Sequence, residues 1–369
     1  MIQALHSAGI GVIMDVVYNH TYFSEDSFFN QLVPAYYHRI KDDGTWSNGS
    51  GCGSDVATER TMVSKMIRES VTYWAQEYHI DGFRFDLMGL MDVDTMNGIR
   101  SDLNALPDGE KIIMYGEAWN LSTSVPAGVE LATQENMYKL DKGIGAFNDT
   151  GRDAIKGSNF NPSEKGFVQE GSSKGGVRSA IEGDGSGWAS VPAQCVNYAS
   201  CHDNLTLYDK LTDSVYGDEK FSLRRDDLVE MNKLSAATVL TSHGVPFMLA
   251  GEELGRTKQG DDNSYISSIE INQIDWKYRY RFTSLTDYYQ GLIRIRKAIP
   301  VLRDATGDST LTYLDSSEKN TIAFSLTQDG SPSVVVALNG DTEKSSKVTL
   351  PSGDWIIIAD ADRDRKSVV

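Results

Sequence analysis

The chain has 369 residues, and 35 Lys plus Arg stand against 52 Asp plus Glu, which gives a formal charge of −17 at pH 7. This charge and the lack of a basic run exclude a nucleic-acid binder, because a protein that neutralises phosphates needs a basic face. At 40% hydrophobic and 24% charged residues the composition is that of an ordinary globular protein, and the length predicts about two domains.

The beginning of the chain predicts a helix followed by a strand. Residues 1–8 have the pattern of the last two turns of an amphipathic helix that ends at Gly9, and residues 10–17 form an apolar, β-branched run typical of buried parallel strands. A domain rarely begins on the final turns of a helix, so we expect further chain upstream of Met1. The compartment, cytoplasmic or secreted bacterial, therefore stays open.

Neither a membrane span nor a disulfide framework is expected. No stretch reaches the roughly 18 apolar residues of a membrane span, so no membrane partner is predicted. Three cysteines, an odd number, cannot all pair within the chain; they are Cys52, Cys195 and Cys201.

The middle of the chain alternates strands with helices. Residues 21–60 are polar, aromatic and rich in Gly, which is typical of a functional loop excursion. Apolar spacing predicts helices over residues 61–78, 95–106, 228–242 and 288–298. Predicted strands cover residues 81–86, 111–117, 143–147, 194–200 and 245–250. This alternation indicates an α/β fold whose parallel sheet is covered on both faces.

The pattern changes from about residue 305 onward. Short alternating runs there are broken by Gly, Asp and Ser, which is typical of antiparallel strands. The predicted strands cover residues 321–326, 333–338, 346–350 and 354–358. We therefore expect a first domain over residues 1–304, with the loop excursion at 21–60, and a small all-β domain over residues 305–369.

Polar side chains gather where four of the predicted parallel strands end. The four segments are Asp15-Val-Val-Tyr-Asn-His20, Gly82-Phe-Arg-Phe-Asp86, Tyr115-Gly-Glu-Ala-Trp119 and Tyr198-Ala-Ser-Cys-His-Asp-Asn204. One Asp at a strand end is most often a solvated or capping carboxylate, but four coordinated strand ends argue against that interpretation. The ligand site of a parallel sheet lies where its strands run out into loops.

The paired carboxylates of adjacent strands suit glycoside hydrolysis. Arg84 lies two residues before Asp86, hence on the same face of a strand, where it would hold Asp86 ionised as a nucleophile. Glu117 has no cation immediately beside it in the sequence and is followed by Trp119, so an apolar neighbour is expected to raise the pKa of Glu117 and suit it to act as a general acid.

Asp203 beside His202 would supply a third carboxylate that binds sugar hydroxyls.

Two rival chemistries are weaker hypotheses. Metal binding by these residues is disfavoured because His20 and His202 lie on distant loops without i, i+4 pairing. A nucleotide enzyme is disfavoured because no Gly-rich phosphate loop follows a strand.

The four segments resemble, in chain order, the motifs of the α-amylase superfamily, glycoside hydrolase family 13. The resemblance implies a (β/α)₈ TIM barrel followed by an antiparallel β domain. It also implies that Asp86 is the nucleophile, Glu117 the general acid/base and Asp203 the transition-state stabiliser. The first motif stands on the third barrel strand of that family, so we expect an incomplete barrel that starts near strand 3, in a fragment of a longer enzyme.

The resemblance implies further roles around these three carboxylates. Substrate-binding roles are expected for Tyr18, His20, Arg84, Trp119, His202, Asn204, Asn263 and Tyr265, and structural roles near the site for Asp15, Asn19 and Asp55. Tyr18, Trp119 and Tyr265 are candidates for stacking on glucose faces, although a buried aromatic residue gives the same pattern.

Other segments favour the debranching subgroup, the type I pullulanases; they are residues 51–60, 147–157, 250–258, 262–265 and 272–276. The expected function is retaining hydrolysis of α-1,6 links in pullulan and branched α-glucans by a monomer whose partner is the glucan. Isoamylase-like or α-1,4-acting relatives, and a non-catalytic carbohydrate-binding fragment, stay as alternatives. No cofactor is required by this chemistry, and Ca²⁺ is left open because family members often bind it through acidic loops.

Overall fold

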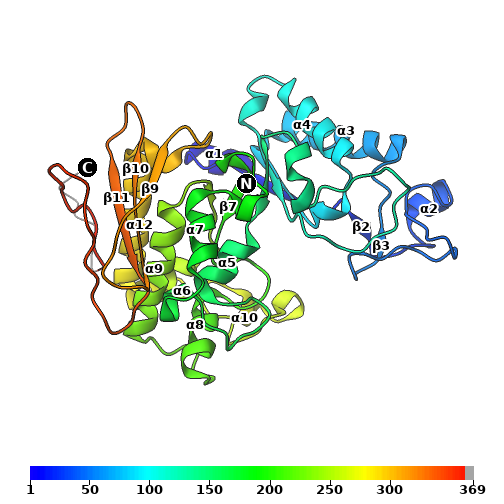
Figure 1. Ribbon diagram of the computed structural model, residues 1–369. Helices are drawn as coiled ribbons and strands as arrows, with labels where there is room; N and C mark the ends of the chain where they lie inside the picture. Colours follow the sequence, from blue (N-terminus) through cyan, green and yellow to red (C-terminus); the bar gives the residue numbers. More distant parts are fainter. Residues whose placement is uncertain (362–369) are drawn as a thin grey trace. The chain divides into compact units, whose positions relative to one another are not determined.

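The computed structural model describes residues 1–361 (Figure 1). The chain divides into two compact units. The first unit comprises residues 1–147 and 188–194, and the second comprises residues 148–187 and the chain from residue 195 on. Within the described part of the chain, no helix combines the length and the apolar composition that crossing a membrane requires.

The first unit contains parallel strands whose spatial order follows their order in the chain. They are β1 (Ile13–Val16), β4 (Gly82–Phe85), β5 (Ile113–Gly116) and β6 (Ile144–Phe147). The pairing places Asp15 opposite Arg84 and Arg84 opposite Tyr115. The residues that follow β1, β4 and β5 therefore meet at one edge of the sheet.

Helices and short loops complete the first unit. The helices are α1 (Ile2–Ser7), α2 (Phe28–Leu32), α3 (Thr61–Tyr78), α4 (Val93–Asn104) and the 3₁₀ turns η1 (Met88–Leu90), η2 (Gly109–Lys111), η3 (Gln134–Lys139) and η5 (Pro192–Gln194). Figure 1 shows α3 beside α4. Val63, Ile67 and Val71 recur every four residues along α3 and are buried in one core with Phe83 and Phe85 of β4.

The second unit has parallel strands β7 (Cys195–Asn197) and β8 (Val245–Pro246), and an antiparallel sheet. That sheet has the order β11-β10-β9, from β9 (Thr310–Tyr313), β10 (Thr321–Thr327) and β11 (Val334–Asn339). Its central strand β10 buries Ile322, Phe324 and Leu326 in the same core as residues of α9 and α12. Figure 1 shows the sheet along these two helices.

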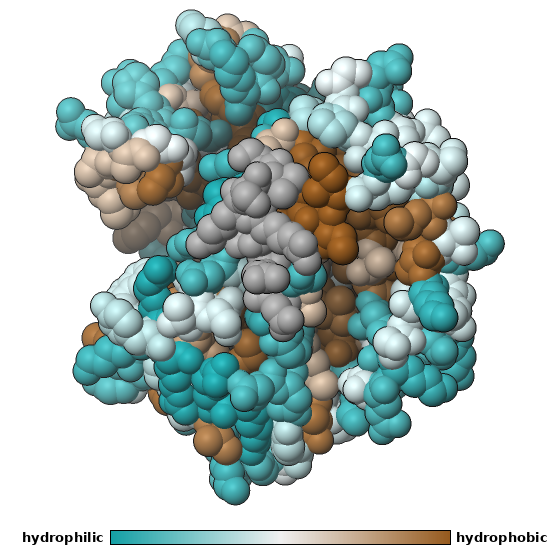
Figure 2. All heavy atoms as spheres, turned by 90° about the vertical axis from the view of Figure 1, so that its left-hand side faces the viewer, coloured by the Kyte–Doolittle hydropathy of each residue, from teal (hydrophilic) through white to brown (hydrophobic). Residues whose placement is uncertain are grey.

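The helices of the second unit differ widely in length. They are α5 (Asp149–Lys156), α6 (Phe167–Glu170), α7 (Lys174–Glu182), α8 (Leu207–Tyr216), α9 (Asp226–Thr241), α10 (Ile269–Asn272), α11 (Tyr278–Arg281) and α12 (Thr283–Ala298). The 3₁₀ turns are η4 (Gly185–Gly187), η6 (Glu252–Leu254), η7 (Ser264–Ile266) and η8 (Pro300–Arg303). Figure 2 looks at the side where β9–β11 lie and shows hydrophobic side chains gathered on a mostly hydrophilic surface.

The expected fold class, parallel α/β strands followed by a small antiparallel sheet, is confirmed. The predicted strands at 346–350 and 354–358 were wrong: Val348 only forms an isolated bridge with Ser316. A short alternating run becomes a strand only where a neighbouring strand offers its hydrogen bonds. The predicted division at residues 304 and 305 stays a prediction, and residues 362–369 of that expected domain lie outside the described residues.

The first predicted strand is not buried as expected. The residue Ile13 is 41% exposed, and Ile10 and Val17 are exposed as well. In the described structure β1 pairs with β4 and stands at the end of the strand order, so apolar composition by itself misjudged its burial. The strand predicted over residues 245–250 shortens to β8, because the chain turns into η6 after it.

Candidate active site

One guanidinium joins three carboxylates at the ends of β1, β4 and β5. Nη1 of Arg84 donates to Oδ1 of Asp15 at 2.8 Å and to Oδ1 of Asp86 at 3.0 Å. Nη2 of Arg84 donates to Oε1 of Glu117. The parallel register produces this meeting, because it sets the three strand ends side by side. We call these four residues the Arg84 cluster.

Burial differs between the carboxylates of the Arg84 cluster. The side chains of Arg84 and Glu117 are 7% and 10% exposed, that of Asp86 is 22% exposed and that of Asp15 is 57% exposed. Burial by itself lowers the pKa of Arg84, but the charges of Glu117, Asp15 and Asp86 outweigh it and raise that pKa above the usual arginine value. The guanidinium therefore stays charged and holds the buried Glu117 and the partly buried Asp86 in place.

The expectation that Glu117 lies away from any cation was wrong. Arg84 contacts Glu117 across 33 positions of the chain, a neighbourhood that the residues beside Glu117 do not reveal. The backbone N–H of Leu87 also donates to Oε2 of Glu117 at 3.0 Å. Both carboxylate oxygens of Glu117 are therefore fixed by donors from the segment that carries Asp86.

The turn after Asp86 is strained and tightly packed. Leu87 adopts the left-handed conformation (φ 37°, ψ 49°), which is uncommon for a residue with a branched side chain. The N–H of Gly89 donates to the carbonyl of Glu117 at 2.9 Å, and a Cβ at Gly89 would lie 1.9 Å from the carbonyl oxygen of Trp119. Only glycine lets the two segments approach so closely.

Asn19 and His20 extend the cluster along the chain from β1. Nδ2 of Asn19 donates to the carbonyl of Asp86 at 2.6 Å and to its Oδ2 at 3.0 Å. Nδ1 of His20 lies 2.5 Å from Oδ1 of Asn19. Each oxygen of Asp86 thus has its own donor, Arg84 on Oδ1 and Asn19 on Oδ2, which sets the plane of the carboxylate.

Asp55 stabilises the loop beside His20. The short strands β2 (His20–Thr21) and β3 (Ser54–Asp55) pair with His20 opposite Asp55. The buried Asp55 carboxylate accepts bonds from the backbone N–H of Gly49 and from the hydroxyls of Ser47 and Thr123. These bonds anchor part of the long loop excursion.

The aromatic candidates have different environments. The hydroxyl of Tyr18 lies 2.8 Å from that of Ser70 on α3, and burial raises the pKa of Tyr18. Trp119 is half-buried, whereas Tyr265 in η7 is 81% exposed. Stacking on glucose stays a prediction for all three, and Tyr265 offers the freest ring face.

The remaining predicted residues lie in the second unit. Nε2 of His202 lies 3.4 Å from Oδ1 of Asp203, and both side chains are more than half exposed. Asn204 adopts a left-handed backbone (φ 60°), and its Oδ1 accepts from Nδ2 of Asn159. Asn263 is exposed, and its N–H donates to Asp261. The catalytic role of Asp203 stays a prediction.

Sequence reasoning missed two charged residues that bond to the loop of His202. Nζ of Lys258 donates to the carbonyl of His202 at 2.9 Å, and the Glu252 carboxylate accepts from Ser200. Both lie in the segment 250–258, whose residue types by themselves are typical of loops and helix caps. The sequence did contain a signal: Glu252 and Lys258 follow closely after an apolar strand. Charged residues need partners if they are buried there.

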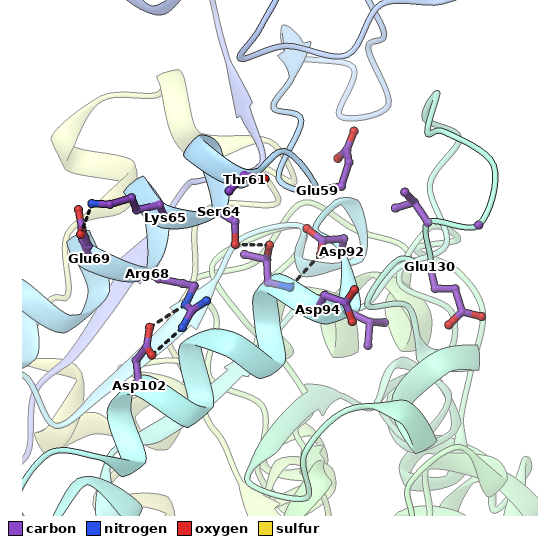
Figure 3. Close-up of a pocket in the computed structure, with 14 residues that line it drawn as sticks. Glu59, Thr61, Ser64, Lys65, Arg68, Glu69, Asp92, Asp94, Asp102 and Glu130 are labelled. Atoms are coloured by element: carbon purple, nitrogen blue, oxygen red, sulfur yellow. Dashed lines mark hydrogen bonds and ion pairs between the residues drawn. The ribbon is translucent and has the colours of Figure 1, made fainter.

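A cavity of about 630 Å³ lies between α3, α4 and residues 128–130 of the first unit (Figure 3). Its walls carry matched charges, such as the bidentate pair of Arg68 with Asp102 and the pair of Lys65 with Glu69. None of the predicted site residues lines it. Among residues 1–361, no group of three or more His, Cys, Asp or Glu side chains is arranged to hold a metal ion. Calcium binding stays a prediction.

Known proteins resemble the chain in sequence. No protein-family model matches it. The pullulanase of Bacillus subtilis (strain 168) is 42% identical over 310 residues, which cover 82% of this chain and 42% of that protein. The chloroplastic pullulanase 1 of Arabidopsis thaliana is 32% identical, over 75% of this chain and 34% of that protein.

Solved structures resemble the chain in fold. The pullulanase from Bacillus acidopullulyticus superposes with a TM-score of 0.90 at 39% identity, covering 100% of this chain and 45% of that one. The Paenibacillus barengoltzii pullulanase, in complex with maltohexaose and α-cyclodextrin, has a TM-score of 0.86 at 41% identity over 92% of this chain and 53% of its own. The chain is therefore a homologue of the pullulanases, which are glycoside hydrolases, and it spans about half the length of these relatives.

Proposed function

We propose that this chain carries the reacting carboxylates of a retaining debranching glycoside hydrolase that cleaves α-1,6 links in pullulan and branched α-glucans. The observation that carries the proposal is the Arg84 cluster, in which one guanidinium binds both Asp86 and Glu117. Two carboxylates on one guanidinium favour the close spacing of a retaining pair, roughly 5–5.5 Å, over the wider spacing of an inverting pair.

Asp86 is suited to act as the nucleophile. Arg84 and Asn19 each hold one of its oxygens, so the carboxylate is oriented, and its side chain is still 22% exposed. The first step requires Glu117 in its protonated form: Asp86 attacks the anomeric carbon while Glu117 gives its proton to the bridging oxygen, and the cleaved glucan leaves as an alcohol. In the second step Glu117 takes a proton from water, the water oxygen bonds to the anomeric carbon, and the bond between that carbon and Asp86 breaks.

The substrate class rests on the relatives. The Paenibacillus barengoltzii pullulanase is in complex with maltohexaose and α-cyclodextrin, and one similar protein is named a glycogen debranching enzyme. We extend the α-glucan substrate to this chain. Isoamylase-like or α-1,4 cleavage and non-catalytic glucan binding are the alternatives that the experiment separates.

The test incubates the 369-residue chain with pullulan and measures reducing ends and maltotriose. We expect maltotriose from the parent chain and a loss of about 10⁴-fold in kcat for Asp86→Asn, because the nucleophile is removed. NMR of the first product should show the α-anomer, since retention keeps the configuration. The matched control is Asp94→Asn, an exposed carboxylate on α4 outside the cluster, which should keep the parent rate.

Four outcomes contradict this proposal. Turnover that survives Asp86→Asn removes the nucleophile assignment, and a β-anomer as first product removes retention. Binding of pullulan without maltotriose release supports the non-catalytic alternative. Faster release of reducing ends from amylose than from pullulan supports α-1,4 cleavage.

A further inference from the structure

A buried carboxylate bonds to the loop of residues 200–204. Glu252, the first residue of η6, is 6% exposed. Its Oε2 accepts from the hydroxyl of Ser200 at 2.5 Å, and its Oε1 accepts from the hydroxyl of Tyr289 on α12 at 2.7 Å. Nδ2 of Asn232 on α9 also donates to the carbonyl of Glu252 at 3.3 Å. Two long helices thus fix the acid that fixes the loop.

A buried lysine bonds to the same loop at a second residue. Nζ of Lys258 donates to the carbonyl of His202 at 2.9 Å and to the hydroxyl of Ser264 at 2.6 Å. Its backbone N–H donates to the buried carboxylate of Asp209 at 2.7 Å. Glu252 and Lys258 therefore bond to the residues on either side of Cys201.

The far end of the loop is fixed in a conformation that costs energy. The left-handed Asn204 is bonded to Asn159, whose Oδ1 in turn accepts from Nζ of the buried Lys156 at 2.8 Å. Such a backbone persists only where its surroundings impose it. The loop is thus held at Ser200, His202 and Asn204, whereas the side chains of His202 and Asp203 stay exposed.

Burying these charges is expensive, so a purely structural loop would be stabilised more cheaply by apolar side chains. Burial raises the pKa of Glu252 to about 7, and this rise is opposed by the bonds from Ser200 and Tyr289 and by the charge of Lys156. Glu252 therefore stands in the core although burying its carboxyl group costs free energy.

We propose that Glu252 is a positioning residue that acts through Ser200 to set the backbone of residues 200–204, and with it the direction of His202 and Asp203. The inference rests on the proposed function and on the roles that the family resemblance implies, substrate binding for His202 and transition-state stabilisation for Asp203. Glu252 itself touches no substrate.

The three cysteines provide a test that needs no turnover. Cys201 lies inside the loop, Cys195 is buried in β7 and Cys52 is exposed. The rate at which iodoacetamide alkylates each thiol is measured by peptide mass spectrometry in the whole chain. We expect Glu252→Leu and Ser200→Ala to speed alkylation of Cys201 about tenfold, with Cys52 and Cys195 unchanged, because only the loop opens.

Conservative variants separate positioning from general stability. Glu252→Gln keeps an oxygen for Ser200 and should restore the parent rate at Cys201. Glu253→Gln is the matched control. Glu253 is the next residue in the chain, and among the described hydrogen bonds its carboxylate accepts only from the N–H of Gly251. Where the parent chain turns over pullulan, Glu252→Leu should lower kcat about tenfold with KM changed less than about twofold, as a misplaced group does.

The proposal is overturned if Cys201 reacts at the parent rate in both Glu252→Leu and Ser200→Ala, or if Cys195 accelerates together with Cys201. Ser200→Ala removes a single oxygen and decides the matter if Glu252→Leu does not fold. A parent chain without turnover contradicts the proposed function, whereas the alkylation rates still decide on the positioning role.

Discussion

The Arg84 cluster and the loop of residues 200–204 hold their functional side chains in opposite ways. In the Arg84 cluster the carboxylates themselves are bound: Asp86 and Glu117 are mostly buried and share one cation. In the loop, the hydroxyl of Ser200 and the backbone carbonyl of His202 are bound, and the side chain of Asp203 is 65% exposed. The first region orients charge directly, and the second orients the chain that carries the charge.

The difference teaches what each arrangement demands of its surroundings. A carboxylate held by a buried cation loses its water, so the pair depends on the charge of its partner. A carboxylate on a fixed loop keeps its water until a ligand displaces it. Its position depends on the hydrogen bonds that fix the loop and not on a cation bound to the carboxylate. Removing the cation should therefore harm the first region more than the second.

The largest expected effect is on Arg84. Arg84→Met should lower the free energy of unfolding by about 3–5 kcal/mol, because it leaves the buried Glu117 and the partly buried Asp86 without their cation. Lys258→Met should cost about 1–3 kcal/mol, since it leaves one carbonyl and one hydroxyl without a donor. Urea unfolding of both variants measures the difference, and equal losses would contradict the comparison.

The next effect concerns pH and the buried acid beneath the loop. The pKa of Glu252 is raised from 4.5 to about 7, so the unfolded chain releases this proton first and stability falls as pH rises from about 4.5 to about 7. The loss is roughly 3 kcal/mol and levels off above that window. Burial lowers the pKa of the nearby Lys156 from 10.5 to about 8, so the titration of Lys156 changes stability only at pH values above this window.

The measurement is the free energy of unfolding of the parent chain minus that of Glu252→Gln across this pH range. The amide cannot ionise, so the difference should fall with rising pH. A flat difference between pH 4.5 and 7 would show that Glu252 is ionised in the folded chain at low pH.

The smallest effect tests the close packing of the Asp86 turn. Gly89→Ala should destabilise the chain by about 1–3 kcal/mol, because the new Cβ meets the backbone of Trp119. Gly175→Ala on α7 meets nothing within 4 Å and should stabilise it by up to about 1 kcal/mol through helix propensity. Thermal unfolding of both variants decides, and a gain in stability from Gly89→Ala would refute the packing argument.

Local patterns predicted the elements that depend on few neighbours. The helix α3 begins and ends at the predicted residues, because its apolar side chains repeat at helical spacing over 18 residues. The parallel strands before Asp86 and Glu117 were predicted within a few residues. Exposure of β1 and the missing strands after residue 345 were not predictable, since pairing depends on what lies beside a strand.

The identity and order of the site residues were determined by the sequence alone, because motifs at strand ends are read along the chain. Only the tertiary structure decided how they are held. Arg84 reaches Glu117 across 33 positions, and Ser200 reaches Glu252 across 52. Contacts of this kind form only when sheet register and helix packing bring distant segments together, and so no local pattern records them.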